Sequence, residues 1–455
     1  MKISFINPPI RTSFPQPPLG LALLAAIAEK SGASVRLFDG TALGFSNERL
    51  AREASGSDVV CMGAMTSSLS SAFSLAKEVK KLNPGAIVVL GGPHASILPK
   101  ETLRECDAID IVVKGEGEGT IAELVKCEFK RLGKISGLAF RDNGKITETP
   151  DRPLIHDLDS LPFPAYNLLD LRKYRPYPPH GKSLPFMPML TSRGCPFKCV
   201  YCSKPVFGNR FRTQSPKRVM EELAYLKEKL GVREVMFYDD SFSLDQKRTA
   251  ELCKMMLEGK LGLPWSCETR VNLVSPELLG LMKKAGCYMI SYGVESGSPK
   301  ILANLRKGIT VEQVEKAFSE TRKAGIKTVA YFMLGSPGET QETVDKTIAF
   351  SQSIGADFAQ FSVCTPLPGS ELFSMVKDKM KGADWSSFNY ADITRLDTSL
   401  LFGSEIKDIA AQTRKAYTSF YLRPGYLAGR LFGMRSLEDV KMNLNGLRML
   451  KSMMG

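Results

Sequence analysis

Three cysteines within eight residues constrain this chain more than any other feature. Cys195, Cys199 and Cys202 follow the spacing C-x3-C-x2-C in the stretch from Thr191 to Lys204. This stretch comes directly after an apolar run, Phe186 to Leu190, which is typical of a buried strand ending in a loop. Thiolates are soft ligands that suit iron–sulfur clusters and zinc. A cubane cluster held by only three cysteines keeps one iron open, where a small molecule can bind and take an electron.

A zinc site is the alternative, because thiolates are also zinc ligands. A closed zinc site needs four ligands, so the fourth would have to come from Cys253, Cys267, Cys287 or one of the three histidines. The chain has no second C-x2-C pair and no H-x3-5-H partner, which favours the iron–sulfur interpretation.

The composition is that of an ordinary globular protein. Of 455 residues, 43% are apolar and 24% are charged, enough for two or three domains. The ten cysteines are spread along the chain, so we expect a reducing compartment, the cytoplasm, rather than a disulfide framework. The apolar stretch Leu19 to Ala28 is too short to span a bilayer, and we expect neither a transmembrane segment nor a signal peptide.

Residues 1–145 alternate short apolar runs with segments of helical spacing. Continuous β-rich runs bounded by Gly, Pro or Asp are typical of parallel strands. We therefore expect a doubly wound, Rossmann-like α/β domain with five parallel strands. The predicted strands are Ile3 to Ile6, Val35 to Phe38, Val59 to Met62, Ile87 to Leu90 and Ile111 to Val113.

Polar and glycine-rich loops follow these strands, at the edge where such sheets bind ligands. None of the loops has the G-x-G-x-x-G spacing of a nicotinamide site. The order NPP, PPLGLALLAAIAEKSG, GGPHA and KGEGE resembles the cobalamin-binding domain of B12-dependent radical S-adenosylmethionine (SAM) enzymes. The resemblance implies cobalamin contacts from Asp39, Thr66, Ser67, Gly91, Gly92, His94, Gly115 and Glu116.

The resemblance has one departure. Many cobalamin domains carry D-x-H-x-x-G, whose histidine ligates cobalt, but here Asp39 is followed by Gly40, Thr41 and Ala42. The sequence therefore implies either cobalamin without that histidine or a domain that has lost the cofactor. His94 is the remaining candidate for an axial ligand.

Residues 146–185 are rich in proline, which forbids regular helix and favours an extended linker. From 186 to 380, strands and helices alternate in six β/α units, which predicts a partial (β/α)6 barrel. Polar residues cluster at the carboxyl ends of its strands, where β/α barrels carry out chemistry. The predicted strands are Phe186 to Leu190, Val235 to Tyr238, Trp265 to Glu268, Tyr288 to Tyr292, Thr328 to Met333 and Phe358 to Val363.

The cysteine spacing, with Tyr201 just before the last cysteine, and the barrel pattern resemble the radical SAM superfamily. The resemblance implies a [4Fe-4S] cluster on Cys195, Cys199 and Cys202, with its open iron chelated by the amino and carboxylate groups of SAM. Tyr201 would lie against the adenine, and the GSPGE turn at Gly335 would shape the adenine pocket. The other implied SAM contacts are Asp239, Asp240, Glu268, Arg270, Glu295 and Lys307.

Residues 381–455 are expected to form a small helical region. Between Lys407 and Lys451, nine basic and three acidic side chains are mixed with aromatic residues. This pattern favours short helices that close the open barrel, with peripheral membrane contact as the alternative. The net charge of +13 is often only a solvated surface, and we expect no nucleic-acid partner.

Two enzymatic hypotheses follow from the resemblance. In the first, reductive cleavage of SAM yields a 5'-deoxyadenosyl radical, and cobalamin-dependent methyl transfer reaches an unactivated carbon of a small-molecule or lipid-like substrate. In the second, the same machinery performs cyclisation, rearrangement or oxidation of a lipid- or pigment-like substrate without methyl transfer. Both need a low-potential electron donor, a ferredoxin or flavodoxin. A third interpretation, an iron–sulfur electron carrier, is disfavoured by the polar loops at the strand ends.

Overall fold

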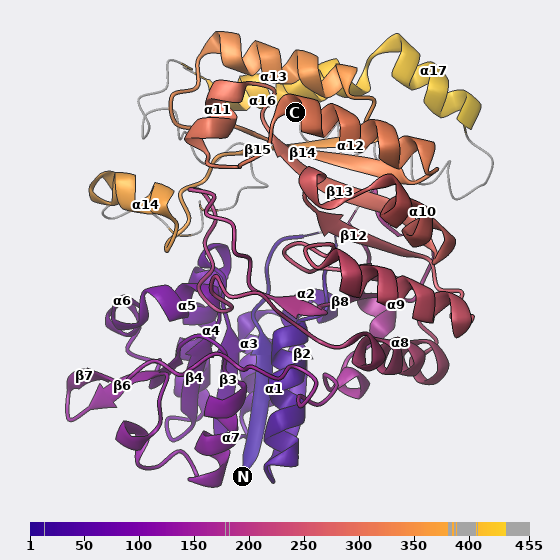
Figure 1. Ribbon diagram of the computed structural model, residues 1–455. Helices are drawn as coiled ribbons and strands as arrows, with labels where there is room; N and C mark the ends of the chain where they lie inside the picture. The colour runs from indigo at the N-terminus through magenta and orange to yellow at the C-terminus, as the bar shows by residue number, and fades with distance from the viewer. Residues whose placement is uncertain are drawn as a thin grey trace.

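The chain folds into two α/β units, seen here in a computed structural model that describes residues 1–433 except 13, 178, 182, 381–384, 386–387, 389–405 and 407. The N-terminal unit occupies the lower half of Figure 1 and the C-terminal unit the upper half. The predicted fold class is confirmed, because a Rossmann-like sheet is followed by a six-stranded parallel sheet of the partial-barrel type.

The N-terminal sheet has the strand order β2-β1-β3-β4-β5-β6-β7. Its first five strands are parallel, and the order reverses between β1 and β3, which is the switch point where doubly wound sheets bind ligands. Helices cover both faces of the sheet, and its inner strands β3, β4 and β5 are accordingly continuous apolar runs, whereas the edge strand β2 also carries polar residues. The five strands are β1 Lys2–Asn7, β2 Ser34–Asp39, β3 Val59–Gly63, β4 Ile87–Gly91 and β5 Ile111–Val113.

The helices of this unit form two layers (Figure 1). α1 and α7 pack together on one face of the sheet, and α3 and α4 pack together on the other. The bounds are α1 Leu19–Lys30, α2 Gly40–Leu43, α3 Asn47–Ala54, α4 Leu69–Leu82, α5 Pro93–Ile97, α6 Pro99–Glu105 and α7 Glu118–Lys126.

Two strands beyond the predicted five extend the sheet. β6 (Leu138–Asp142) pairs antiparallel with β5, and β7 (Lys145–Glu148) pairs antiparallel with β6. The hairpin turns at Asn143 and Gly144, which have φ of 47° and 77°. Asn-Gly tolerates these left-handed angles, which two-residue hairpin turns require. The N-terminal sheet therefore continues to Glu148.

The C-terminal sheet has the order β15-β14-β13-β12-β11-β8, with all strands parallel. Each crossover contains at least one helix, so the predicted β/α alternation is present. The strands are β8 Phe186–Met189, β11 Glu234–Phe237, β12 Trp265–Thr269, β13 Cys287–Glu295, β14 Lys327–Leu334 and β15 Phe358–Val363. The helices are α8 Pro216–Leu230, α9 Gln246–Glu258, α10 Pro276–Lys284, α11 Pro299–Asn304, α12 Val311–Lys323, α13 Gln341–Ser353 and α14 Glu371–Val376.

The tail helix α16 (Ile409–Tyr421) covers β15, the edge strand of the barrel sheet. Tyr417 Oη donates to Phe361 O at 3.2 Å, and Tyr421 Oη donates to Ala359 O at 2.7 Å. α17 (Pro424–Gly433) follows it, and the rest of the tail, residues 434–455, lies outside the described residues. Within the described residues, none of the helices combines the length and the apolar character needed to cross a bilayer.

Candidate active site between the two domains

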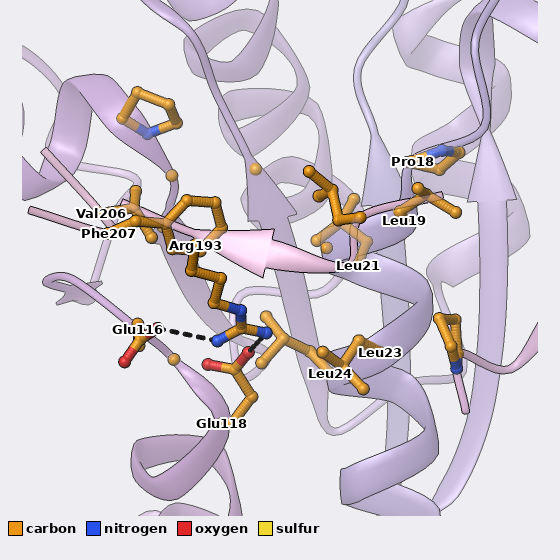
Figure 2. Close-up of a pocket in the computed structure, with 18 of the residues that line it drawn as sticks. Pro18, Leu19, Leu21, Leu23, Leu24, Glu116, Glu118, Arg193, Val206 and Phe207 are labelled. Atoms are coloured by element: carbon orange, nitrogen blue, oxygen red, sulfur yellow. Dashed lines mark hydrogen bonds and ion pairs between the residues drawn. The ribbon is translucent and has the colours of Figure 1, made fainter. Parts of the chain in front are cut away.

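A cavity of about 640 Å³ opens between the carboxyl ends of the two sheets. The N-terminal domain contributes the loops after β1, β3, β4 and β5, and the barrel contributes residues that follow β8 and β11. The start of α1, with Pro18, Leu19, Leu21, Leu23 and Leu24, forms an apolar wall (Figure 2). The size of the cavity is typical of a ligand site, and it lies at the edge where doubly wound sheets bind their ligands.

Four of the residues expected to contact cobalamin line this cavity: Gly91, Gly92, Gly115 and Glu116. Gly92 has φ of 96°, and a Cβ there would lie 2.9 Å from the carbonyl oxygen of Ala64. Only glycine allows the loop after β4 to pack this closely beside the end of β3. The loops thus bring backbone groups, rather than large side chains, to the edge of the cavity.

The other four expected cobalamin contacts are not among the residues that line the cavity. Asp39 caps α2, accepting from Thr41 N at 3.1 Å, and also accepts from Asn7 Nδ2 at 3.0 Å. Thr66 and Ser67 lie in a short 3-10 turn after β3. His94 is buried, with Nδ1 3.1 Å from Thr66 Oγ1.

An aromatic contact also holds the ring of His94. Its ring packs edge-on against Trp385, with 5.0 Å between the ring centroids. Burial lowers the pKa of His94 to about 4, so the ring is neutral at physiological pH. The hydrogen bond to Thr66 and the contact with Trp385 hold His94 in the packing between the N-terminal domain and the segment that follows the barrel.

The loop that carries the three cysteines is braced from within. β9 (Ser192–Arg193) pairs antiparallel with β10 (Arg212–Thr213) and closes its base. Lys204 Nζ donates to Cys195 O at 2.7 Å and to Phe197 O. Gly194 has φ of 81°, and a Cβ there would lie 2.4 Å from Arg210 O, so this position requires glycine.

The three thiols themselves are partly exposed. Burial raises the pKa of Cys195, and it raises that of Cys202 to about 11. Because thiolates are the metal-binding form, loading a metal centre here at neutral pH releases protons.

Four of the residues expected to bind SAM gather beside the cysteine loop. Glu295 Oε1 accepts from Lys307 Nζ at 2.6 Å and from Tyr201 Oη at 2.9 Å. Arg270 Nη1 lies 3.8 Å from Cys199 Sγ, and its guanidinium stacks on the ring of Phe197 at 3.7 Å. Glu295 occupies the left-handed region with φ of 69°, a strained conformation for a side chain of this size.

The remaining expected SAM residues have different surroundings. Asp240 lines the cavity, while Glu268 accepts from Tyr331 Oη at 2.9 Å. Gly335 N donates to Glu339 Oε2 at 2.5 Å within the GSPGE turn. Asp239 is buried and accepts from Thr191 N, Thr191 Oγ1 and Ser192 Oγ, so its carboxylate anchors the start of the cysteine loop.

Comparison with known proteins agrees with this geometry. Residues 189–351 match the radical SAM superfamily and residues 11–125 match the B12 binding domain. Over 446 residues the chain is 38% identical to an uncharacterized methyltransferase of Pyrococcus horikoshii, a match that covers 95% of each protein. The chain belongs to the B12-binding radical SAM enzymes. Its cofactors are a [4Fe-4S] cluster, SAM and cobalamin.

Two further similarities bear on this radical SAM enzyme. It is 31% identical to the anaerobic magnesium-protoporphyrin IX monomethyl ester cyclase of Cereibacter sphaeroides over 438 residues, covering 92% of this chain and 70% of the cyclase. A solved structure of the cobalamin-dependent SAM radical enzyme OxsB superposes with a TM-score of 0.75 at 15% identity, covering 99% of this chain and 71% of OxsB. The likeness to OxsB shows a shared fold.

The residues present fit these cofactors. Three thiols on one loop suit a cluster with an open iron, and no three His, Cys, Asp or Glu side chains in the described part of the chain lie close enough to hold a single metal ion. The alternative zinc ligands Cys253, Cys267 and Cys287 are buried in the apolar core. For cobalamin, the cavity offers glycine loops at the strand ends and the apolar wall of α1.

Sequence reasoning missed the charged residues that join the domains at this site. Arg193 and Arg212, from the strands that flank the cysteine loop, both form ion pairs with Glu116 in the loop after β5. Arg193 also pairs with Glu118, the first residue of α7, and Figure 2 shows both pairs of Arg193. Glu116 was expected at cobalamin, and its carboxylate is engaged with both arginines instead of pointing freely into the cavity. No local pattern signals these pairs, because their partners are at least 75 positions apart in the chain.

Proposed function

We propose that this enzyme transfers a methyl group from cobalamin to an unactivated carbon of a small-molecule substrate. One observation carries the proposal: a single cavity is lined both by the ligand-binding edge of the B12 domain and by the barrel residues that flank the cysteine loop. The 38% identity to a methyltransferase over nearly the whole chain supports the same conclusion.

When bound, the [4Fe-4S] cluster and SAM supply a carbon-centred radical, and cobalamin supplies the methyl group. In this proposal, Cys195, Cys199 and Cys202 hold three of the four irons. Arg270 places positive charge beside the cysteine loop, where the carboxylate of SAM would be attracted. Lys307, paired with Glu295, is proposed to contact SAM beside it. Tyr201 is held by its hydrogen bond to Glu295 and would support the adenine.

Asp240 is the proposed partner of the SAM amino group. It lies one residue beyond the buried Asp239 and is exposed to the cavity. The surrounding protein partly desolvates its carboxyl group, which raises the pKa of Asp240, and the charge of Lys204 opposes this rise without cancelling it. On the other side of the cavity, the backbone at Gly91, Gly92 and Gly115 would contact cobalamin. The apolar wall of α1 excludes water between the two, which protects a radical from unwanted reactions.

Radical cyclisation is the second candidate, favoured by the 31% identity to the magnesium-protoporphyrin cyclase. The two functions differ in their SAM products. Methyl transfer consumes one SAM to make the radical and a second SAM to supply the methyl group, so 5'-deoxyadenosine and S-adenosylhomocysteine form together. Cyclisation forms 5'-deoxyadenosine alone.

A labelled-methyl experiment tests the proposal. Extracts of cells that contain or lack the gene are supplied with methionine carrying a deuterated methyl group, and their small molecules are compared by mass spectrometry. A gene-dependent product with the labelled methyl group is expected, and it identifies the substrate. A gene-dependent product that carries no label would support cyclisation instead.

We also propose an electron donor and a membrane contact for this enzyme. The cluster needs one electron per turnover, for which a ferredoxin or flavodoxin of the cytoplasm has the required low potential. All the cysteines of the chain are free, as a reducing compartment requires. The basic and aromatic tail would place the enzyme at an anionic membrane surface if its substrate is lipid-like.

A further inference from the structure

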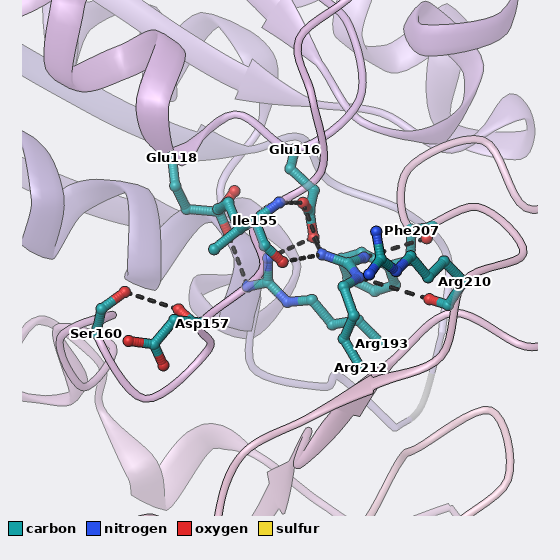
Figure 3. Close-up of polar contacts among 9 residues, drawn as sticks. All are labelled: Glu116, Glu118, Ile155, Asp157, Ser160, Arg193, Phe207, Arg210 and Arg212. Atoms are coloured by element: carbon teal, nitrogen blue, oxygen red, sulfur yellow. Dashed lines mark hydrogen bonds and ion pairs between the residues drawn. The ribbon is translucent and has the colours of Figure 1, made fainter.

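Four buried charged side chains join the two domains beside the cavity (Figure 3). Arg193 donates to Glu116 Oε1 at 2.8 Å and to Glu118 Oε1 at 2.6 Å. Arg212 Nη1 lies 2.9 Å from each carboxylate oxygen of Glu116. Both carboxylates belong to the B12 domain and both guanidinium groups to the barrel domain, so every ion pair of this network crosses the interface.

The linker between the domains takes part in the same network. Ile155 N donates to Glu116 Oε2 at 2.6 Å, and Arg212 Nη1 donates to Ile155 O at 2.6 Å. Arg212 Nη2 donates to Phe207 O at 3.2 Å, in the loop that follows the cysteines. The B12 domain, the linker and the cysteine loop therefore meet at Glu116 and Arg212.

These charges are almost completely removed from water. The side chains of Glu116 and Arg212 are 2% and 3% exposed, and those of Glu118 and Arg193 are 9% and 10% exposed. Two positive and two negative charges balance, but desolvation offsets most of their attraction, so such a network adds little net stability over an apolar contact. The network instead fixes the relative orientation of the groups it joins, because a planar guanidinium donates hydrogen bonds to carboxylates in few orientations.

The network connects the turn after β5, which lines the cavity, to the base of the cysteine loop. Glu116 lies in the turn after β5 and Glu118 is the first residue of α7, and both line the cavity. Arg193 lies two residues before Cys195, and Arg212 is its partner in the β9–β10 pair. Gly194 is the single residue between Arg193 and Cys195, and it packs closely against the loop at Arg210, where an added Cβ would lie 2.4 Å from the carbonyl oxygen. The backbone position of Arg193 is therefore closely tied to that of the first cluster cysteine.

We infer that Arg193, Glu116 and Glu118 set the position of the cluster loop relative to the loop that contacts cobalamin. This inference rests on the proposed function, because it assigns the network to two cofactors that act across one cavity. The three are positioning residues, since their charged groups bind one another. A misplacement of about 1 Å between reacting groups costs about 100-fold in rate, which gives a directional interface a use that stability alone does not.

Three variants distinguish an effect on the relative orientation of the two loops from an effect on the stability of the fold. Arg193→Lys keeps the charge and loses the planar fork, and Glu118→Gln keeps the shape and loses the charge. The double variant Arg193→Met/Glu118→Leu replaces the ion pair with apolar side chains, which should keep the stability of the fold but remove the hydrogen bonds that fix the orientation of the two loops. Glu123→Gln is the matched control, because Glu123 lies on the same helix α7 and binds Arg152 in a fork at 3.0 and 2.8 Å without reaching the barrel domain.

The readout is the magnetic coupling between the reduced cluster and cob(II)alamin, measured by EPR on protein loaded with both. This coupling depends on the distance and orientation between the two centres. We expect a shifted or broadened coupling in Arg193→Lys, Glu118→Gln and the double variant, with iron and cobalamin contents as in the wild type. Glu123→Gln should keep the wild-type coupling.

Wild-type coupling in Arg193→Lys and in the double variant would overturn the inference, because the network would then only add stability. A double variant that loads neither cofactor would also overturn it, since each site is expected to survive the loss of the fork. If the wild-type protein itself binds no cluster or no cobalamin, the proposed function fails as well. Wild-type protein that binds both, with variants that couple normally, leaves the proposed function standing and removes the inference alone.

Discussion

Replacing Asp239 with alanine should destabilise the protein and reduce its iron content, whereas replacing its neighbour Asp240 should do neither. Asp239 is 1% exposed and accepts from Thr191 N at 2.8 Å, Thr191 Oγ1 at 3.0 Å and Ser192 Oγ at 2.6 Å. Asp240 is exposed at the cavity, and no described residue donates a hydrogen bond to its carboxylate.

The magnitude follows from the groups left behind. Asp239→Ala removes the acceptor from three donors, of which the backbone N–H of Thr191 cannot rotate to a new partner. It also leaves the buried Arg248 without this nearby negative charge. We expect a loss of about 3–5 kcal/mol in the free energy of unfolding. Asp239→Asn keeps one acceptor oxygen and should lose about 1–2 kcal/mol, while Asp240→Ala should stay within about 0.5 kcal/mol of the wild type.

Urea unfolding of the metal-free proteins, followed by circular dichroism, measures these differences. Anaerobic reconstitution then gives the iron content per chain, which should fall in Asp239→Ala because the start of the cysteine loop has lost its anchor. Asp240→Ala should keep its iron and lose affinity for SAM by about 10- to 100-fold, the worth of one charge-assisted hydrogen bond. An Asp239→Ala protein with wild-type stability and full iron content would refute this reasoning.

Three further predictions concern single side chains. Burial raises the pKa of Glu339 from 4.5 to about 7. Because the native state then binds this proton more tightly than the unfolded state, the free energy of unfolding should fall as pH rises from 4.5 to about 7, by about 3 kcal/mol at most. Glu339→Gln should remove this fall in urea unfolding followed across the window, and parallel curves for the two proteins would contradict the assignment. His94→Ala should leave the axial-ligand hyperfine pattern of bound cob(II)alamin unchanged in EPR, because His94 is held by Thr66 and Trp385; a lost nitrogen splitting would show that it ligates cobalt. Lys307→Met removes the 2.6 Å partner of the buried Glu295 and should cost about 3–5 kcal/mol in the free energy of unfolding. Adding Glu295→Gln to this variant should recover much of the loss, because the unpaired carboxylate is then gone. Equal losses in the single and double variants would argue against this pair.

The elements that sequence reasoning predicted well are those with a local signal. All six barrel strands and all five parallel strands of the first sheet are short runs rich in apolar, aromatic or β-branched residues, and the structure has each of them within a few residues of the predicted bounds. The hairpin of β6 and β7 was missed because β7, KITE, is short and half-exposed and carries little apolar periodicity. Its Asn143-Gly144 turn is the signal that could have revealed it.

Site residues divide in the same way. Tyr201, Arg270, Glu295 and Lys307 were predicted from the resemblance to radical SAM enzymes, and the fold brings them together. Arg270 and Glu295 lie at the carboxyl ends of the parallel strands β12 and β13, whereas Tyr201 lies in the cysteine loop and Lys307 after α11. The separate surroundings of Asp239 and Asp240 could not be predicted, since adjacent residues at a strand end share every local pattern. Which of them is buried depends on Thr191 and Ser192, nearly fifty positions earlier in the chain.

The central claim is that the three-cysteine loop carries a cluster whose open iron binds SAM. Anaerobically reconstituted protein, reduced and supplied with SAM, should release 5'-deoxyadenosine, measured by mass spectrometry, and Cys199→Ala should release none. Release of 5'-deoxyadenosine by the Cys199→Ala protein at the wild-type rate, or a wild-type protein that contains zinc and cleaves no SAM, would contradict the account.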